Sequence, residues 1–274
     1  MNILLYQGAD PTLEARNIKF IESILKIDKK ILVGNRDCDE GSVTRLKNIN
    51  TQREFSSYEV GLNYIKHNFG KNINLVVANE TIFNHRVFDR SLQNAFKKSF
   101  SLCHKINKPA IAGVLDKLNN KEDYFKLGYH QESFISTWLF MLNKEAVSKF
   151  DTFLIEDKYV PDKNNTGNHI FKNSYSSDYL LDIEKWVTLQ GNHKKWYGNE
   201  PLNDKNRNKL TLKAISIINE RWVSYQLQIQ KVQFFNVQDF VKRGFVEFFL
   251  YRFFLTRNSI KFRLKRLYKG LDIW

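Results

Sequence analysis

Three polar segments in the first 81 residues each follow a short apolar run, and their side chains could bind a ligand through hydrogen bonds. The segments are residues 7–10, 35–39 and 79–81. The apolar runs before them predict parallel strands, and ligands of open parallel sheets bind outside the carboxyl ends of the strands. We therefore expect the three segments to share one edge of a sheet.

The elements that must position these segments alternate along the first 115 residues, which is the pattern of strands joined by crossover helices. Strands are predicted at residues 3–6, 30–34, 73–78 and 111–115, and helices at residues 18–25, 42–46 and 58–69. A longer helical pattern covers residues 206–232. The sequence thus predicts an α/β fold with a helical C-terminal part.

A fourth polar segment, residues 128–133, lies between the apolar runs 111–115 and 134–142. His130 could contact a diphosphate or a sugar, and Gln131 or Glu132 could accept hydrogen bonds from sugar hydroxyls. A lone histidine is more often a residue that makes a structural hydrogen bond, which is the alternative role of His130. Trp138 offers a flat face for a sugar ring, and burial in the core is its alternative role.

Several of these runs, taken in order, resemble glycosyltransferases over about residues 1–195. The run ILVGNRDCDEGSVTRL (31–46) resembles the strand-two signature of family 2 enzymes, and LVVANETIF (75–83) resembles the strand that delivers their acidic element. Residues 112–140 are similar to the rhamnan-synthesis branch of polysaccharide glycosyltransferases. The resemblance implies a GT-A-like, Rossmann-like mixed sheet flanked by helices. It also implies a hexosyltransferase-like enzyme that moves a sugar from a nucleotide diphosphate sugar to a hydroxyl of a growing polysaccharide or glycolipid, with inversion.

The resemblance assigns the donor site to the predicted sheet edge. Asn79, Glu80 and Thr81 correspond to the pyrophosphate element, and Glu80 could hold Mg²⁺ or Mn²⁺, because hard cations prefer oxygen ligands. Only one carboxylate is present there, so a Lys or Arg is the alternative that compensates the leaving group. Gly34 stands where the family has an aspartate, so other residues must contact the nucleotide. The candidates are Gln7, Gly8, Asn35, Asp37, Asp39 and Gln131.

The family's catalytic base is a carboxylate at the start of a helix in the acceptor half, and residues 176–191 have that shape. Asp178 is the predicted base, with Asp182 and Glu184 as alternatives and with His130 and Glu132 in the same catalytic set. Ser176 or Ser177 followed by acids is equally a helix N-cap, which would explain the segment without catalysis.

The chain has 274 residues and a net charge of +14, from 43 Lys plus Arg against 29 Asp plus Glu. Its two cysteines cannot form a disulfide framework. Residues 252–269 carry seven basic residues and no acid among aromatic and aliphatic side chains, which is typical of segments that lie on anionic membranes. We expect a glycosyltransferase domain at 1–200 and a basic, aromatic extension at 201–274, in a cytoplasmic protein on the inner face of the cell membrane.

Two other classes remain open from the sequence. A basic surface with aromatic side chains also binds nucleic acid. A protein with this fold could alternatively be non-catalytic, since fold does not fix function.

Overall fold

The computed structural model describes residues 1–35, 38–48, 52–85, 88–122, 131–155, 183–184, 187–188 and 202–242. Its strands are β1 (Asn2–Gln7), β2 (Lys29–Gly34), β3 (Cys38–Glu40), β4 (Val43–Lys47), β5 (Asn74–Asn79), β6 (Ala110–Glu122), β7 (Gln131–Leu142) and β8 (Gln233–Asn236). Its helices are α1 (Pro11–Ile24), α2 (Glu54–Phe69), α3 (Ile82–His85), α4 (Arg90–Lys105), α5 (Lys144–Lys149), α7 (Arg207–Ile229) and the 3₁₀ helix η2 (Val237–Phe240).

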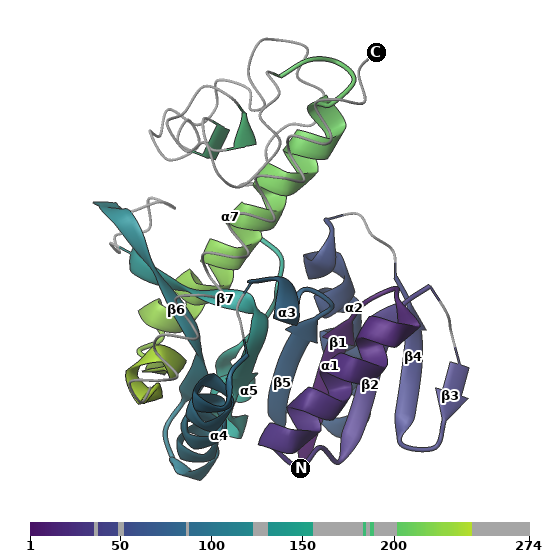
Figure 1. The fold of residues 1–274 in the computed structure, drawn as a ribbon, viewed down its shortest axis with the longest axis vertical. Helices are drawn as coiled ribbons and strands as arrows, with labels where there is room; N and C mark the ends of the chain where they lie inside the picture. Colours follow the sequence, from purple (N-terminus) through teal and green to yellow (C-terminus); the bar gives the residue numbers. More distant parts are fainter. Residues whose placement is uncertain are drawn as a thin grey trace.

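The strands form one mixed sheet in the order β3-β4-β2-β1-β5-β7-β6-β8 (Figure 1). The central strands β4, β2, β1 and β5 are parallel, and β7 is antiparallel to both β5 and β6. The predicted α/β class, a Rossmann-like mixed sheet flanked by helices, is confirmed. β8 lies beyond the expected domain boundary at residue 200 and pairs with β6, so the sheet uses residues from both sides of that boundary.

Each face of the sheet is covered by its own helices, because successive strand side chains point to opposite sides. Ile3, Leu5 and Val77 face α2, α5 and the C-terminal half of α7, whereas Leu4 and Tyr6 face α1 and α4. The N-terminal half of α7 rises past the sheet edge (Figure 1) and packs in a third cluster with Ile155, Ile183 and Val187, among others. No helix among the described residues is both long and apolar enough to cross a bilayer.

The helix predicted over residues 42–46 is wrong, because this segment is strand β4. It pairs in parallel with β2 and closes a hairpin with β3. Gly41, with φ +63°, makes the turn of that hairpin. The β-branched Val43 and Thr44 suit a strand, and the pairing partner at residues 30–34 is too distant in sequence for local periodicity to reveal it.

A ladder of polar side chains on α7 bonds to the edge of β7 that extends beyond β5. The last β5–β7 pair is Ala78 with Leu139. Beyond it, Thr137 N donates to Glu220 Oε1 (3.0 Å), Ile135 N donates to Ser224 Oγ (2.7 Å), and Gln228 Nε2 donates to Ser133 O (3.0 Å).

The spacing of this ladder follows from element geometry. Four helical residues rise about 6 Å, and two strand residues rise about 6.6 Å, so residues at i, i+4 and i+8 of α7 stay level with alternate residues of β7. Side chains thereby satisfy backbone groups that have no neighbouring strand, which is required of buried backbone polar groups. The ladder fixes α7 to the sheet.

We expect Ser224→Ala to destabilise the fold by about 1–3 kcal/mol, because it leaves the buried Ile135 N–H without its partner. Thermal or urea unfolding measures this loss. The control is Ser148→Ala, which removes an exposed hydroxyl bonded to the Glu145 carbonyl and should change stability little. Equal stabilities of the two variants would contradict the ladder.

Candidate functional site

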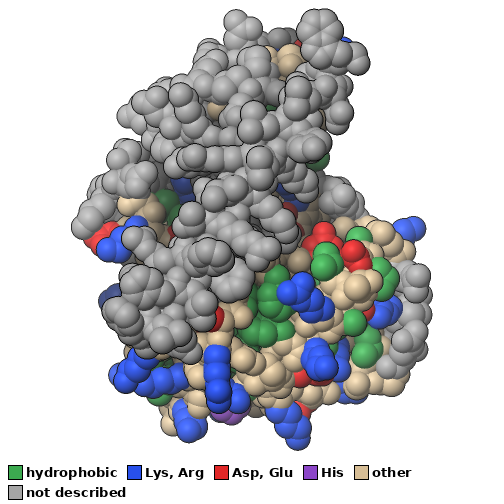
Figure 2. Space-filling model, viewed as in Figure 1, with side chains coloured by type: hydrophobic (Ala, Val, Ile, Leu, Met, Phe, Trp, Pro, Cys, Tyr) green, Lys and Arg blue, Asp and Glu red, His purple; other side chains and the backbone are tan. Residues whose placement is uncertain are grey.

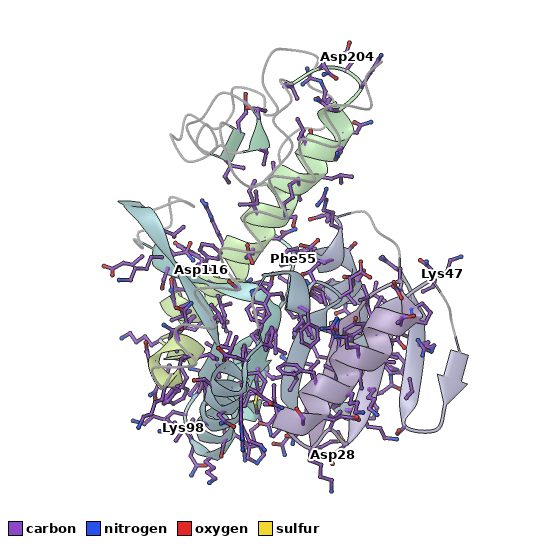
Figure 3. All side chains as sticks on the ribbon, in the orientation of Figure 1. Asp28, Lys47, Phe55, Lys98, Asp116 and Asp204 are labelled. Atoms are coloured by element: carbon purple, nitrogen blue, oxygen red, sulfur yellow. The ribbon has the colours of Figure 1, made fainter. Side chains whose placement is uncertain are left out.

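The carboxyl ends of β1, β2 and β5 meet at one edge of the sheet, as the sequence predicted. Gln7 is in register with both Val33 of β2 and Asn79 of β5. Figure 3 labels Lys47, which ends β4, and Phe55, in the first turn of α2, along this edge, whereas Asp28 lies at the opposite edge. We call the segments 7–10, 34–35 and 79–81 the rim.

Hydrogen bonds tie the β1 and β5 segments of the rim together. Glu80 N donates to the Gln7 carbonyl at 3.0 Å, and Ala9 N donates to Glu80 Oε2 at 3.1 Å. The Glu80 carboxylate therefore bridges the loop after β1 and the loop after β5. Its position is fixed by backbone contacts, which is what a binding group requires.

The rim lies at the point where the strand order reverses. From β1 the chain passes through α1 to β2 on one side, and later through α2 to β5 on the other. α1 and α2 cover opposite faces of the sheet. In open α/β sheets such a switch point leaves a crevice outside the strand ends, where ligands bind. The bridge from Ala9 to Glu80 crosses this switch point.

Asn79, at the end of β5, makes the hydrogen bonds that shape the β5 segment of the rim. Its Oδ1 accepts hydrogen bonds from Thr81 N (3.0 Å) and Thr81 Oγ1 (2.6 Å), which shapes the turn after β5. Its carbonyl accepts from the fully buried Asn17 Nδ2 at 3.5 Å, and Asn17 also donates to Tyr6 Oη at 3.0 Å. Asn17 was not predicted from the sequence as part of the site. Its signal was that a polar residue stands on the same helix face as the apolar Ile21 and Ile24.

The described donors of the rim do not by themselves complete a shell for a divalent cation. Asn79 Oδ1 is turned onto Thr81, and Glu80 is the single carboxylate of the element. Within the described ranges, no group of three or more His, Cys, Asp or Glu is placed to hold a metal. The N–H groups of Thr12 and Leu13 in the first turn of α1 do not replace a metal by binding the diphosphate directly, because both already donate to the capping Asp10. Mg²⁺ or Mn²⁺ at Glu80 stays a prediction.

Gly34 has a structural reason to be glycine. An added Cβ would lie 2.5 Å from the Gly8 carbonyl oxygen, so any side chain there requires the loop after β1 to move. The aspartate of the resembling family therefore does not fit this position in this arrangement. The neighbouring Asn35 is exposed at the rim, and Asp37 lies outside the described residues.

A carboxylate from α7, Glu220, lies beside the rim and was missed by the sequence analysis. It accepts hydrogen bonds from both Thr137 N and Thr137 Oγ1 at 3.0 Å, and Tyr58 Oη donates to the Thr137 carbonyl at 3.1 Å. Burial raises the pKa of Glu220, while the bonds from Thr137 and the charge of Lys213 oppose the rise. The signal in the sequence was the four-residue spacing of Ser216, Glu220 and Ser224 along one face of α7.

Tyr58 of α2 bonds to the same strand residue, Thr137, as this carboxylate. Burial raises the pKa of its hydroxyl well above the ordinary value, the charge of Glu54 adds to the rise, and a side-chain hydrogen bond with Asn79 opposes it. Tyr58 is fully buried and stays protonated, so it donates to Thr137 at neutral pH. α2, β7 and α7 thus share one hydrogen-bonded network.

Gln131 and Glu132 do not join the rim. Gln131 is buried at the start of β7, where its Nε2 donates to the Arg221 carbonyl at 3.1 Å, and Glu132 beside it is exposed. Eight residues separate Gln131 from Leu139, which is roughly 26 Å along an extended strand. Trp138 is 5% exposed and packs edge-on against Phe88 and Phe96, so its role is in the core.

The predicted acceptor-side residues lie largely outside the described ranges. His130, Asp178 and Asp182 are among them. Glu184 is described and is 3% exposed, with its carbonyl accepting from Thr188. The structure therefore leaves the base assignment a prediction.

Comparisons with known proteins give a distant structural likeness. No protein-family model and no curated protein matches the chain. Among solved structures, the chain is similar to the 2-C-methyl-D-erythritol 4-phosphate cytidylyltransferase of Francisella tularensis, with 10% identity and a TM-score of 0.32. The match covers 53% of this chain and 74% of that one. At these values the likeness carries no argument about chemistry.

We expect Gly34→Ala to lower stability by about 1–3 kcal/mol, because the new methyl group displaces the Gly8 carbonyl. Thermal unfolding measures the loss. Asn35→Ala, at the exposed neighbour, is the control and should leave the melting temperature nearly unchanged. A Gly34→Ala variant as stable as the control would contradict this prediction, because it would show that the loop after β1 moves without a loss of stability.

Proposed function

We propose that the protein is a glycosyltransferase that moves a sugar from a nucleotide diphosphate sugar to a hydroxyl of a polysaccharide or glycolipid acceptor, with inversion. The observation that carries this proposal is the rim, whose β1 and β5 loops are bridged by Glu80 at the switch point of the sheet. The sequence resemblance places the pyrophosphate element at the same Asn79-Glu80-Thr81 segment. Rim geometry and sequence resemblance support the same donor site.

The rim supplies groups suited to the nucleotide half of the donor. The exposed Asn35 offers an amide for ribose or base. Gly8 is buried against the Tyr6 ring, so Asn35 is the better placed of the two predicted nucleotide contacts. Arg53, the N-cap residue before α2, has φ 55° and ψ −139°, a conformation that costs a non-glycine residue about 1–3 kcal/mol and that concentrates at functional sites. We assign its guanidinium as the described candidate that compensates the leaving diphosphate.

The chemical step needs one proton acceptor. Asp178 accepts the proton of the acceptor hydroxyl as that oxygen bonds to the anomeric carbon, and the bond from this carbon to the diphosphate oxygen breaks. The nucleoside diphosphate leaves with the bonding electrons. General base catalysis of this kind contributes about 10²–10⁴-fold to the rate.

Nucleotide binding is the first test of the proposal. Because a ligand that binds only the folded state stabilises it by mass action, UDP, GDP or dTDP at 100 times its dissociation constant should add about 2.7 kcal/mol and raise the melting temperature. Glu80→Ala should weaken this binding about tenfold or more. Glu145→Ala, on α5 at the other end of β5, is the matched control. If none of the three nucleotides shifts the melting temperature, the proposal fails.

The base is tested separately. Asp178→Asn should reduce release of nucleoside diphosphate from a donor sugar by about 10²–10⁴-fold while leaving nucleotide binding intact. Asp182→Asn, at the alternative base, is measured in parallel. Loss of turnover in Asp182→Asn alone would move the base to Asp182. If the wild-type protein binds nucleotide but transfers sugar to no acceptor tested, the result supports the non-catalytic alternative.

A further inference from the structure

The solvent face of α4 is a basic surface with one exposed leucine. Residues 90, 94, 97, 98, 101, 102 and 105 recur at helical spacing, and opposite them Leu92, Phe96, Phe100 and Cys103 are buried against the sheet. Residues 90–115 contain five Lys or Arg and no Asp or Glu. Figure 2 shows Lys and Arg side chains gathered over this part of the molecule, where Figure 3 labels Lys98. We call Arg90, Lys97, Lys98, Leu102 and Lys105 the α4 face.

Leu102 sits at the centre of this charge. It is 38% exposed, and within the described part of the chain only Met1 and Ile229 are other large apolar side chains with such exposure. Lys98 precedes it by one turn and Lys105 follows it by one turn, so both lie beside it on the same face. An apolar side chain between cations suits the boundary between lipid headgroups and acyl chains.

The C-terminal part of the chain is attached to the same helix. η2 packs on α4, with Lys98 Nζ lying 5.3 Å from the centre of the Phe240 ring. The Ser91 hydroxyl, in the first turn of α4, donates to the Lys242 carbonyl. The basic and aromatic sequence beyond residue 242 therefore starts next to the α4 face, and seven further Lys or Arg follow it in residues 252–269.

We propose that the α4 face docks on an anionic lipid surface. Four of its five residues are cations, and each basic residue near such a membrane strengthens binding about fivefold. The exposed Leu102 favours lipid over nucleic acid, because a phosphate backbone offers no apolar layer for it. The attachment at Lys242 places the folded domain and the basic C-terminal sequence on the same membrane. This inference is independent of the sugar-transfer proposal.

The test uses the full chain and sedimentation with vesicles of phosphatidylcholine that contain 30% or no phosphatidylserine. Lys97→Gln combined with Lys105→Gln should lower the partition coefficient on the anionic vesicles about 25-fold, the product of two fivefold losses. Lys98 is left in place because it packs on Phe240. The matched control is Lys144→Gln with Lys149→Gln on α5, which covers the opposite face of the sheet and should change binding less than twofold.

A second variant separates lipid from nucleic acid. Leu102→Ser keeps every charge and should weaken binding to anionic vesicles while leaving binding to single-stranded DNA unchanged. Vesicle binding by the Lys97/Lys105 variant equal to that of the α5 control would overturn the proposal. A Lys97/Lys105 variant that loses DNA binding but keeps vesicle binding would overturn it as well. Unchanged melting temperatures of both variants show that the fold is intact.

Discussion

The placement of α7 against the unpaired edge of β7 is the constraint on which the rest of the structure depends. β7 extends beyond β5, and its backbone groups there bond to side chains of Glu220, Ser224 and Gln228. A helix can do this because its four-residue spacing matches two residues of a strand. The ladder fixes α7, the longest helix among the described residues, on the sheet face that α2 and α5 cover, and it brings the Glu220 carboxylate beside the rim.

The same contacts connect architecture to the candidate site. Thr137 bonds to α7 through its N–H and hydroxyl and to Tyr58 of α2 through its carbonyl. Asn79 shapes the turn that presents Glu80. The carbonyl of Asn79 in turn accepts from Asn17 of α1, so the turn that presents Glu80 is held from β5 and α1. A rim held in this way is pre-organised, which lowers the entropic cost of binding a ligand.

The cationic α4 face and the polar rim lie on different parts of the molecule. The rim contains Asp10 and Glu80, while the α4 face is cationic and continues into a basic sequence. Neither Cys103, which is buried, nor the described histidines contribute to a metal cluster among the described residues. Under the two proposals, the positive charge bears on where the protein docks, and the few polar groups of the rim bear on what it binds.

The sequence by itself determined the central parallel strands, the covering helices α1 and α2 and the gathering of residues 7–10 and 79–81 at one edge, because apolar runs and helical periods are local signals. Only the tertiary structure decided that residues 43–47 form a strand, since their partner β2 lies elsewhere in the chain. It also decided that Gly34 faces the Gly8 carbonyl and that Glu220 lies beside the rim. Each of these depends on pairing between residues distant in sequence, which no local pattern encodes.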